Sequence, residues 1–279
     1  MNNPWNNRRP SARPPRATPL PRTDLPATGG GGRGGSDELR LYGLNAVLAA
    51  FAARPQALRK LYLLEARIPR LQPLLKWCVA NRVGYRVVEE GDLNKLAGTT
   101  HHEGVVADVL RAPTVPLAQW LQQIGEGPSL ALWLDGVGNP HNLGAILRSA
   151  AHFGAKALLL PPAGSTLALS GAAARVAEGG AEAVPLVQLP ATPQAMAQLR
   201  DAGFGLAATL VDGGDDVFRT SLPARLVYVM GAEGEGMDRD LAGECDLQVS
   251  IPGSGAVESL NVASATAVLL AQWASRRDG

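Results

Sequence analysis

The chain has 279 residues, a net charge of +1 and a hydrophobic content of 46%, enough apolar side chain for one large or two modest buried cores. No run reaches the roughly 18–20 apolar residues that a membrane helix needs, and the first residues lack the apolar stretch of a secretory signal. We therefore expect a cytoplasmic protein that has no contact with a membrane.

The two cysteines, Cys78 and Cys245, lie far apart and form no Cys-x-x-Cys pair. This pattern supports neither a disulfide framework nor a cysteine zinc site. We expect both to be reduced thiols in the core, where free cysteine is usually found.

Residues 1–36 differ in composition from the rest of the chain. Residues 1–35 hold six arginines and one acidic residue, Asp24, are rich in proline and end in the glycine-rich run 29–35. Such a segment buries little apolar surface, so we expect a disordered arm. A cationic arm binds any polyanion by releasing counterions, and a merely solubilising extension fits the composition equally well. The prolines argue against a transit peptide, since they break an amphipathic helix.

Residues 37–111 alternate between helical and strand patterns, which predicts a small α/β domain. We expect helices over residues 41–53, 71–79 and 92–96, and strands over residues 61–64, 85–88 and 104–110. The segment Arg111–Pro116 contains two prolines and is expected to be a linker.

Residues 117–279 repeat the alternation on a larger scale. Strands are expected over residues 130–134, 157–160, 205–210, 226–230 and 247–251. Such nearly continuous apolar strands are typical of a parallel sheet covered on both faces, and open sheets of this kind bind ligands beyond the carboxyl ends of their strands. The loops that follow these strands are therefore the candidate functional segments.

The first notable loop, residues 134–148, leaves a strand and enters a helix through a turn rich in glycine and asparagine. Asn142 is the expected N-cap, and Arg148 follows six residues later, less than two turns away. Both side chains therefore approach the start of the helix, where an arginine can bind a phosphate through two parallel hydrogen bonds. Taken alone, the loop also fits a plain cap and a solvated arginine.

The second loop has the sequence Gly-Ala-Glu-Gly-Glu-Gly at residues 231–236, directly after a buried strand. Its glycines let backbone amides approach a ligand closely. The spacing is not the Gly-x-Gly-x-x-Gly of dinucleotide folds, and its two glutamates would repel a pyrophosphate. A nucleoside without phosphates, such as S-adenosylmethionine, fits better.

The third loop, residues 251–261, begins with Ile-Pro and ends with the step Ser259-Leu260-Asn261 before an apolar helix that continues to about Trp273. The glycines and polar side chains place hydrogen-bond donors at a junction between a strand and a helix. Alone, the segment is typical of an ordinary capped helix.

In order and spacing the three loops resemble the SpoU/TrmH family of RNA 2′-O-ribose methyltransferases. The matches are Asn-x-Gly-x-x-x-Arg at residues 142–148, the glycine-rich turn at 231–236, and Ile-Pro followed by Ser-Leu-Asn-Val at 251–262. Residues 42–47 and 102–107 resemble the ribosomal-protein-like RNA-binding domain that precedes the catalytic domain in many members. The frequent His-Gln-Gly of that domain reads His102-Glu103-Gly104 here, which replaces a neutral amide by a negative charge.

The resemblance implies a C-terminal, trefoil-knotted, parallel-sheet methyltransferase domain preceded by a small α/β RNA-binding domain. It also implies a homodimer and S-adenosylmethionine as the cofactor. The positions that match the family's cofactor contacts, or lie beside them, are Thr209, Leu210, Gly231, Ile251 and Leu260. The positions that match its catalytic residues are Arg148, Asn142, Glu233, Ser259 and Asn261.

The implied chemistry leaves the role of Arg148 open. A ribose hydroxyl is a poor nucleophile and must be oriented and deprotonated. A guanidinium stays protonated near neutral pH. We therefore favour Arg148 as the residue that holds an RNA phosphate, which accepts the proton, and the alternative is that Arg148 itself acts as the general base. No metal is required. The chain's histidines show no metal-ligand spacing, and we expect His101 and His102 to be loop or RNA-facing residues.

The acceptor atom and the RNA follow from different features. The motif loops contain no cysteine nucleophile and no aromatic platform for an extruded base, which favours the 2′-hydroxyl. The two-domain layout favours rRNA, with tRNA as the alternative. A non-catalytic RNA-binding protein and a nicotinamide oxidoreductase are the rival classes. The intact Arg148, Glu233 and Asn261 argue against the first, and the glycine spacing argues against the second.

Overall fold

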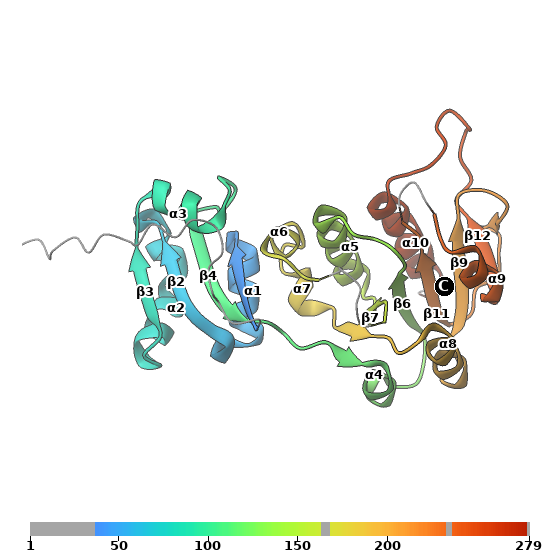
Figure 1. Cartoon of the computed structure of the whole chain (residues 1–279), viewed down its shortest axis with the longest axis horizontal. Coiled ribbons are helices and arrows are strands. Elements are labelled where there is room, and N and C mark those ends of the chain that lie inside the picture. Colours follow the sequence, from blue (N-terminus) through green and yellow to red (C-terminus); the bar gives the residue numbers. More distant parts are fainter. Residues whose placement is uncertain (1–36, 163–167, 233–235, 278–279) are drawn as a thin grey trace, which may run out of the picture. The chain divides into compact units, whose positions relative to one another are not determined.

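The computed structural model describes residues 37–162, 168–232 and 236–277. They form two sheets with helices between their strands, a four-stranded sheet in the order β1-β4-β2-β3 and an eight-stranded sheet in the order β10-β12-β9-β11-β6-β7-β8-β5 (Figure 1). The predicted α/β class is confirmed.

The first sheet is mixed. β4 pairs antiparallel with β1 and β2, and β3 pairs parallel with β2. Buried Leu61 and Leu63 face a core shared with α1 and α2, whereas Tyr62 and Val106 contact α3 on the other face. The strands are β1 (Glu38–Tyr42), β2 (Leu58–Leu63), β3 (Gly84–Val87) and β4 (Val105–Leu110). The helices are α1 (Leu44–Ala53), α2 (Ile68–Ala80) and α3 (Glu90–Ala97), with short 3₁₀ turns at Pro55–Ala57 and Glu65–Arg67.

The prediction of a helix over residues 41–53 was wrong at its start. Leu39 and Leu41 are buried and alternate with exposed Glu38 and Arg40, which is the period-two pattern of an edge strand. The chain then turns at Gly43, whose φ of 93° favours glycine, and the helix begins only at Leu44.

All strand pairs of the second sheet are parallel. Its main strands match the prediction: β6 (Ser129–Leu134), β7 (Ala157–Leu160), β9 (Gly205–Leu210), β11 (Arg225–Met230) and β12 (Leu247–Ser250). Three shorter strands were not predicted: β5 (Val115–Pro116), β8 (Leu186–Gln188) and β10 (Asp215–Asp216). β5 lies in the expected linker, so that segment is partly an edge strand paired with β8.

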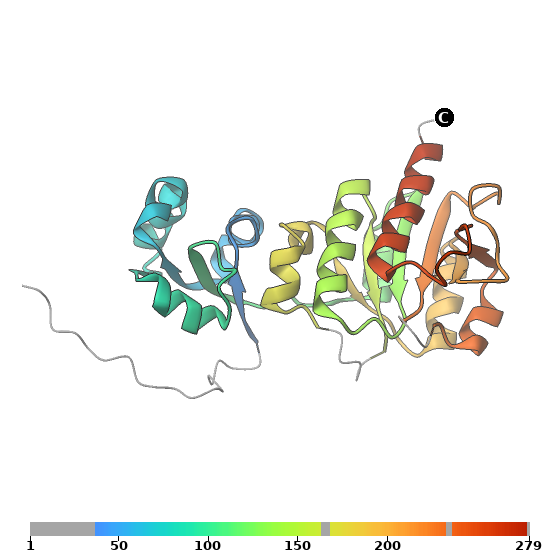
Figure 2. The same cartoon turned by 90° about the horizontal axis from the view of Figure 1, so that it is seen from above.

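Helices cover both faces of the second sheet, as its apolar strands require. One face packs against α5 (Pro140–Phe153), α6 (Gly171–Val176), α7 (Gly180–Ala183) and α10 (Val262–Arg277). The other face packs against α4 (Leu117–Gln123), α8 (Thr192–Asp201) and α9 (Arg239–Glu244). Figure 2 shows α5 and α10 side by side, and their residues contact each other.

The two thiols have different surroundings. Cys78 is buried in the core of the first sheet, as expected, whereas Cys245 is only half-buried at the end of α9. Burial raises the pKa of the Cys245 thiol to about 11, so it stays protonated near neutral pH. Both cysteines are free. Within the described ranges, no helix has the length and apolar content to cross a membrane.

Close packing against α6 explains why the first motif has a glycine at position 144. A Cβ at this position would lie 2.5 Å from the carbonyl oxygen of Ala173 and 2.7 Å from the Cβ of Val176. The glycine therefore lets α5 approach α6 closely.

Gly144→Ala is expected to destabilise the protein by about 1–3 kcal/mol, because the added methyl group must displace backbone. Urea unfolding measures the loss. Gly138→Ala is the matched control, since no atom lies within 4 Å of a Cβ built there. Equal unfolding free energies for the two variants would contradict the packing role of Gly144.

Candidate functional site

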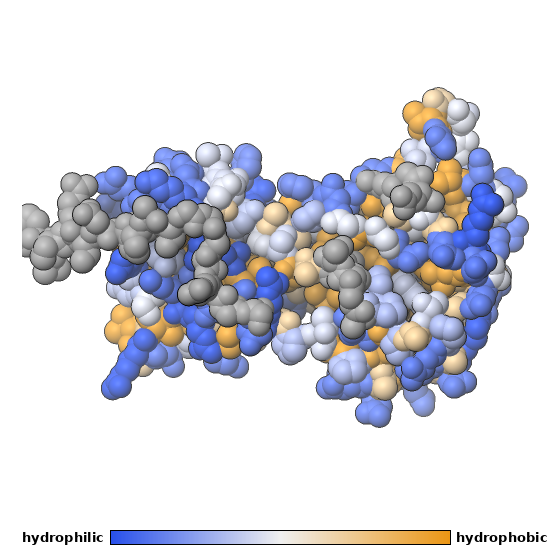
Figure 3. Space-filling view, in the orientation of Figure 1, coloured by the Kyte–Doolittle hydropathy of each residue, from blue (hydrophilic) through white to orange (hydrophobic). Residues whose placement is uncertain are grey.

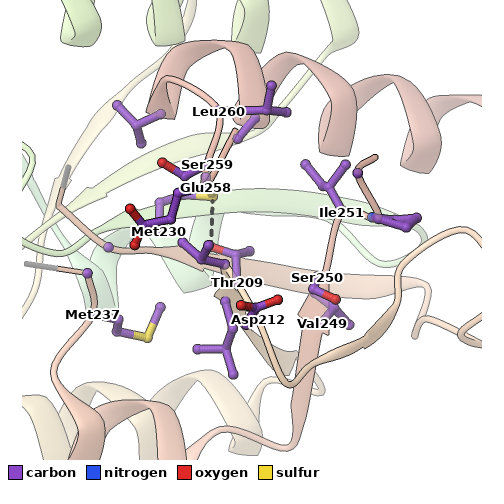
Figure 4. Close-up of a pocket in the computed structure, with 18 of the residues that line it drawn as sticks. Thr209, Asp212, Met230, Met237, Val249, Ser250, Ile251, Glu258, Ser259 and Leu260 are labelled. Atoms are coloured by element: carbon purple, nitrogen blue, oxygen red, sulfur yellow. Dashed lines mark hydrogen bonds between the residues drawn. The ribbon is translucent and has the colours of Figure 1, made fainter. Parts of the chain in front are cut away.

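A cavity of about 870 Å³ opens at the carboxyl ends of β9, β11 and β12 (Figure 4). Its walls come from the loops that follow these three strands and from the start of α10. The lining includes Thr209, Leu210, Asp212, Met230, Gly231, Met237, Ser250, Ile251, Glu258, Ser259 and Leu260.

The parallel register brings these loops to one edge. Met230 pairs with Leu134 on one side and with Thr209 on the other, and Thr209 pairs with Val249. The loops after β6, β9, β11 and β12 therefore leave the sheet at about the same level, where parallel sheets bind ligands.

The five residues predicted to bind a cofactor all line the cavity. The Thr209 hydroxyl donates to the Val229 carbonyl at 2.9 Å and lies 3.5 Å from the Met230 sulfur, which Figure 4 marks as a dashed line. It therefore fixes β9 against β11. Ile251 is half-buried and Leu260 is 48% exposed, so the apolar part of the cavity wall includes both a partly buried and an exposed side chain.

Gly231 is needed for the closure of its own turn. Ala232 and Gly236 exchange two backbone hydrogen bonds of 3.0 and 3.1 Å. A Cβ at Gly231 would lie 2.5 Å from the Met237 nitrogen and 2.6 Å from the Gly236 carbonyl carbon. A side chain there would therefore displace the backbone on the cavity wall. The predicted catalytic residue Glu233 lies outside the described residues.

A pair of asparagines joins the first and third motifs. The Asn261 amide nitrogen donates to the Asn142 side-chain oxygen at 3.1 Å. The Asn261 side-chain oxygen accepts from the backbone of Ala263 at 3.0 Å and Ser264 at 3.3 Å, so Asn261 caps α10. The same side chain thus fixes the start of α10 and holds it beside α5.

Asn142 is not the N-cap of α5, contrary to the prediction. Asn139 caps the helix by accepting from the His141 nitrogen at 2.8 Å, and Pro140 occupies the first helical position. Proline is favoured there because it has no N–H to leave unpaired. Asn142 therefore stands within the first turn, where its side chain can reach Asn261.

Arg148 lies further along α5 and is exposed. It forms no hydrogen bond or ion pair with any other residue that the structure describes. Its guanidinium is thus available to an external anion. Among the predicted catalytic residues that are described, Ser259 lines the cavity, whereas Arg148, Asn142 and Asn261 are not part of the wall.

Two acidic residues of the cavity wall were missed by the sequence reasoning. Asp212 lies two residues after Leu210, and Glu258 directly precedes Ser259. Both are exposed. Asp212 lies outside the three motif loops, and Glu258 lies inside the third loop but is not one of the positions that carry the match. The available signal was their position in loops that follow predicted strands.

The segment His102-Glu103-Gly104 serves the fold. His102 is 2% exposed, its Nδ1 accepts from the Gly104 nitrogen at 3.0 Å, and its Nε2 lies 2.9 Å from the Asn94 side-chain oxygen. His102 thus lies in the loop between α3 and β4, which is one of the two expected alternatives, but its ring is buried and satisfies polar groups of the protein, so it does not face RNA. His101 is exposed, as expected.

Glu103 accepts a hydrogen bond from the Leu44 nitrogen at 3.0 Å and pairs with Arg175 at 3.4 Å. The Glu103 carboxylate therefore interacts with groups of the protein itself. No group of three or more potential metal ligands is found among the described parts of the chain.

The comparisons with known proteins agree with this geometry. Residues 129–271 match the SpoU rRNA Methylase family, and residues 40–114 match the family described as RNA 2′-O ribose methyltransferase substrate binding. The chain belongs to the SpoU rRNA methylase family.

It is 40% identical over 238 residues to the uncharacterized tRNA/rRNA methyltransferase YfiF of Escherichia coli O157:H7, covering 85% of this chain and 68% of that protein. It is 36% identical to the 23S rRNA (guanosine-2′-O-)-methyltransferase RlmB of Pseudomonas putida, covering 85% and 96%. Among solved structures, the AdoMet-bound rRNA methyltransferase from Sinorhizobium meliloti has a TM-score of 0.72 at 25% identity, covering 86% of this chain and 88% of that one.

Asn261→Ala is expected to lower the free energy of unfolding by about 0.5–2 kcal/mol, because α10 loses its cap. Asn261→Asp keeps the capping acceptor and is expected to retain most of this stability. Urea unfolding of both variants separates the cap from the bridge to Asn142. An alanine variant as stable as the wild type would contradict the capping role.

Proposed function

We propose that this protein transfers a methyl group from S-adenosylmethionine to a ribose 2′-hydroxyl of rRNA. The observation that carries the proposal is the meeting of the three family motifs at one sheet edge, where a cavity lies beside the linked starts of α5 and α10. Membership of the family and the printed activities of the RlmB relatives support it.

The cavity fits a nucleoside with a positively charged sulfur. Its size falls in the range of roughly 300–1,000 Å³ that is typical of small-molecule sites. Its wall combines backbone, apolar side chains and the carboxylates of Asp212 and Glu258. Carboxylates disfavour a pyrophosphate, which argues against the nicotinamide alternative. When bound, the cofactor supplies a methyl group activated by the positive sulfur.

The chain's own residues orient the acceptor. We assign Arg148 to the RNA phosphate beside the target ribose, which it holds through its exposed guanidinium. This phosphate accepts the proton that the 2′-hydroxyl loses as its oxygen gains the methyl group. Asn142, Ser259 and Asn261 supply hydrogen bonds that position the ribose. Glu233 completes the set by family resemblance.

The parts of the chain take different tasks in this proposal. Residues 37–111 bind the RNA substrate, which the family match over residues 40–114 supports. Residues 117–279 form the catalytic domain, and residues 1–36 are a basic arm that adds charge-driven affinity for RNA. An RNA-modifying role fits a cytoplasmic location.

A trefoil knot in the catalytic domain and a homodimer belong to the same proposal. Membership of the SpoU family supports the knot, an exception to the rule that chains do not thread themselves. Exposed apolar side chains on the cavity loops support the dimer: Val211 is 54% exposed and Val257 72% exposed. Figure 3 shows hydrophobic surface on the projecting loop between β12 and α10.

rRNA is favoured over tRNA because the RlmB relatives named as 23S rRNA methyltransferases are covered over almost their whole length. The tRNA/rRNA name of YfiF keeps tRNA as the second candidate. Comparing maps of 2′-O-methylation in stable RNA from cells with and without this gene identifies the nucleotide.

Arg148→Ala is expected to lower methyl transfer about 100-fold or more while cofactor affinity stays nearly unchanged, because Arg148 positions RNA and does not line the cavity. A transfer assay with labelled methyl groups and calorimetric titration measure the two quantities. Arg219→Ala, which removes another exposed arginine, is the control. Full activity in Arg148→Ala would overturn the assignment.

Gly231→Val is expected to weaken cofactor binding about 10-fold or more, because the side chain displaces the turn that forms the wall. Calorimetry measures the affinity, and circular dichroism checks the fold. Gly125→Val is the control, since a Cβ there meets no atom within 4 Å. Wild-type affinity in folded Gly231→Val protein would show that this turn is not the pocket.

Replacing the target nucleotide by its 2′-deoxy form is expected to remove methyl transfer and leave RNA binding mostly intact, since the accepting oxygen is absent. A transfer assay and a gel-shift titration with the matched ribose RNA test this. Continued methylation of the deoxy position would mean that a base is the acceptor.

A further inference from the structure

We propose that Asp212 and Glu258 make the cavity a charge filter, which binds the cationic cofactor in preference to its neutral product. The inference rests on the proposed function and assigns a role to two acidic residues that are not among the matched positions of the family motifs. Figure 4 shows both side chains at the cavity, on separate loops.

The positions of the two carboxylates are fixed by their loops. Asp212 lies in the loop between β9 and β10. That loop is held against β12, because the Ser250 hydroxyl donates to the Gly214 carbonyl at 2.9 Å and a Cβ at Gly214 would lie 2.6 Å from the Val249 carbonyl carbon. Glu258 lies three residues before Asn261, the residue that caps α10. Each of the two acidic residues is therefore within three positions of a residue that a hydrogen bond holds in place.

Neither carboxylate is neutralised within the described chain. Asp212 and Glu258 form no hydrogen bond or ion pair with another described residue. Arg239 also lines the wall, so the described lining carries two carboxylates and one guanidinium. The wall of this part of the chain thus has an excess of negative charge, and a cation entering the cavity is attracted.

The ligand changes charge during the reaction. S-adenosylmethionine carries a sulfonium, an ammonium and a carboxylate, for a net charge of +1. When the sulfur–carbon bond breaks and the oxygen–carbon bond forms, the sulfur keeps the electron pair and becomes a neutral thioether, while the hydroxyl proton passes to the phosphate. The product has no net charge. The negatively charged wall therefore attracts the product less strongly than it attracts S-adenosylmethionine.

The test measures binding of three ligands to the full chain by calorimetry: S-adenosylmethionine, S-adenosylhomocysteine, and sinefungin, in which an amine-bearing carbon replaces the sulfonium. Asp212→Asn and Glu258→Gln are expected to weaken the two cationic ligands about 3- to 5-fold each, and about 10-fold together. Affinity for S-adenosylhomocysteine should stay the same. Asp201→Asn, an exposed carboxylate away from the cavity, is the control and should change none of the three.

The outcomes are distinct. Equal weakening of all three ligands would overturn the charge filter and show that the carboxylates contact a part that the ligands share, with the proposed function intact. Unchanged affinities in both variants would also overturn it. If the wild-type chain binds none of the three, the proposed function fails, and the filter fails with it.

Discussion

The strands β6, β11, β9 and β12 pair in parallel, and this pairing determines where the loops with the motif residues lie. Parallel strands all end at the same edge, so loops far apart in the sequence meet there. Asn142 and Asn261 are separated by 119 positions and still form a 3.1 Å hydrogen bond. If the pairing register of one of these strands were shifted, the motifs would be separated and the cavity wall would be opened.

Two neighbouring parts of the protein at this edge present different chemical groups. The cavity is built from backbone and apolar side chains that surround a small ligand, with Gly231 required by the tightness of its turn. The starts of α5 and α10 lie beside it and present polar groups, and the exposed Arg148 adds a fixed positive charge further along α5. In the proposed function, this separation lets the cavity bind a nucleoside while the neighbouring surface binds a phosphate and a ribose.

Much of this arrangement could be predicted from the sequence. The five main strands of the second sheet were recognisable because their apolar residues are concentrated in runs of four to six positions, although β12 exposes Gln248. β8 and β10 have too few residues for a periodic pattern. Leu39 and Leu41 were missed because their alternation runs directly into a helical pattern. The motif order identified the cavity residues, whereas the cap at Asn139 depended on Pro140, which the motif did not emphasise.

Other features depend on the tertiary structure. The burial of His102 and the pairing of Glu103 with Arg175 join residues whose contacts no local pattern encodes. Asp212 and Glu258 line the cavity on two loops, one bonded to β12 through Ser250 and the other followed by Asn261, which bonds to Asn142 of α5. Sequence reasoning finds the positions that match a motif, whereas the other side chains that line the site are identified only in the folded chain.

The central claim is methylation of a ribose oxygen. The most direct measurement incubates the protein with large-subunit rRNA from cells that lack it and with S-adenosylmethionine carrying a deuterated methyl group. The RNA is then digested to nucleosides, which are fragmented in a mass spectrometer. The account predicts that the deuterated methyl group remains with the sugar fragment. A label on the base fragment would contradict it.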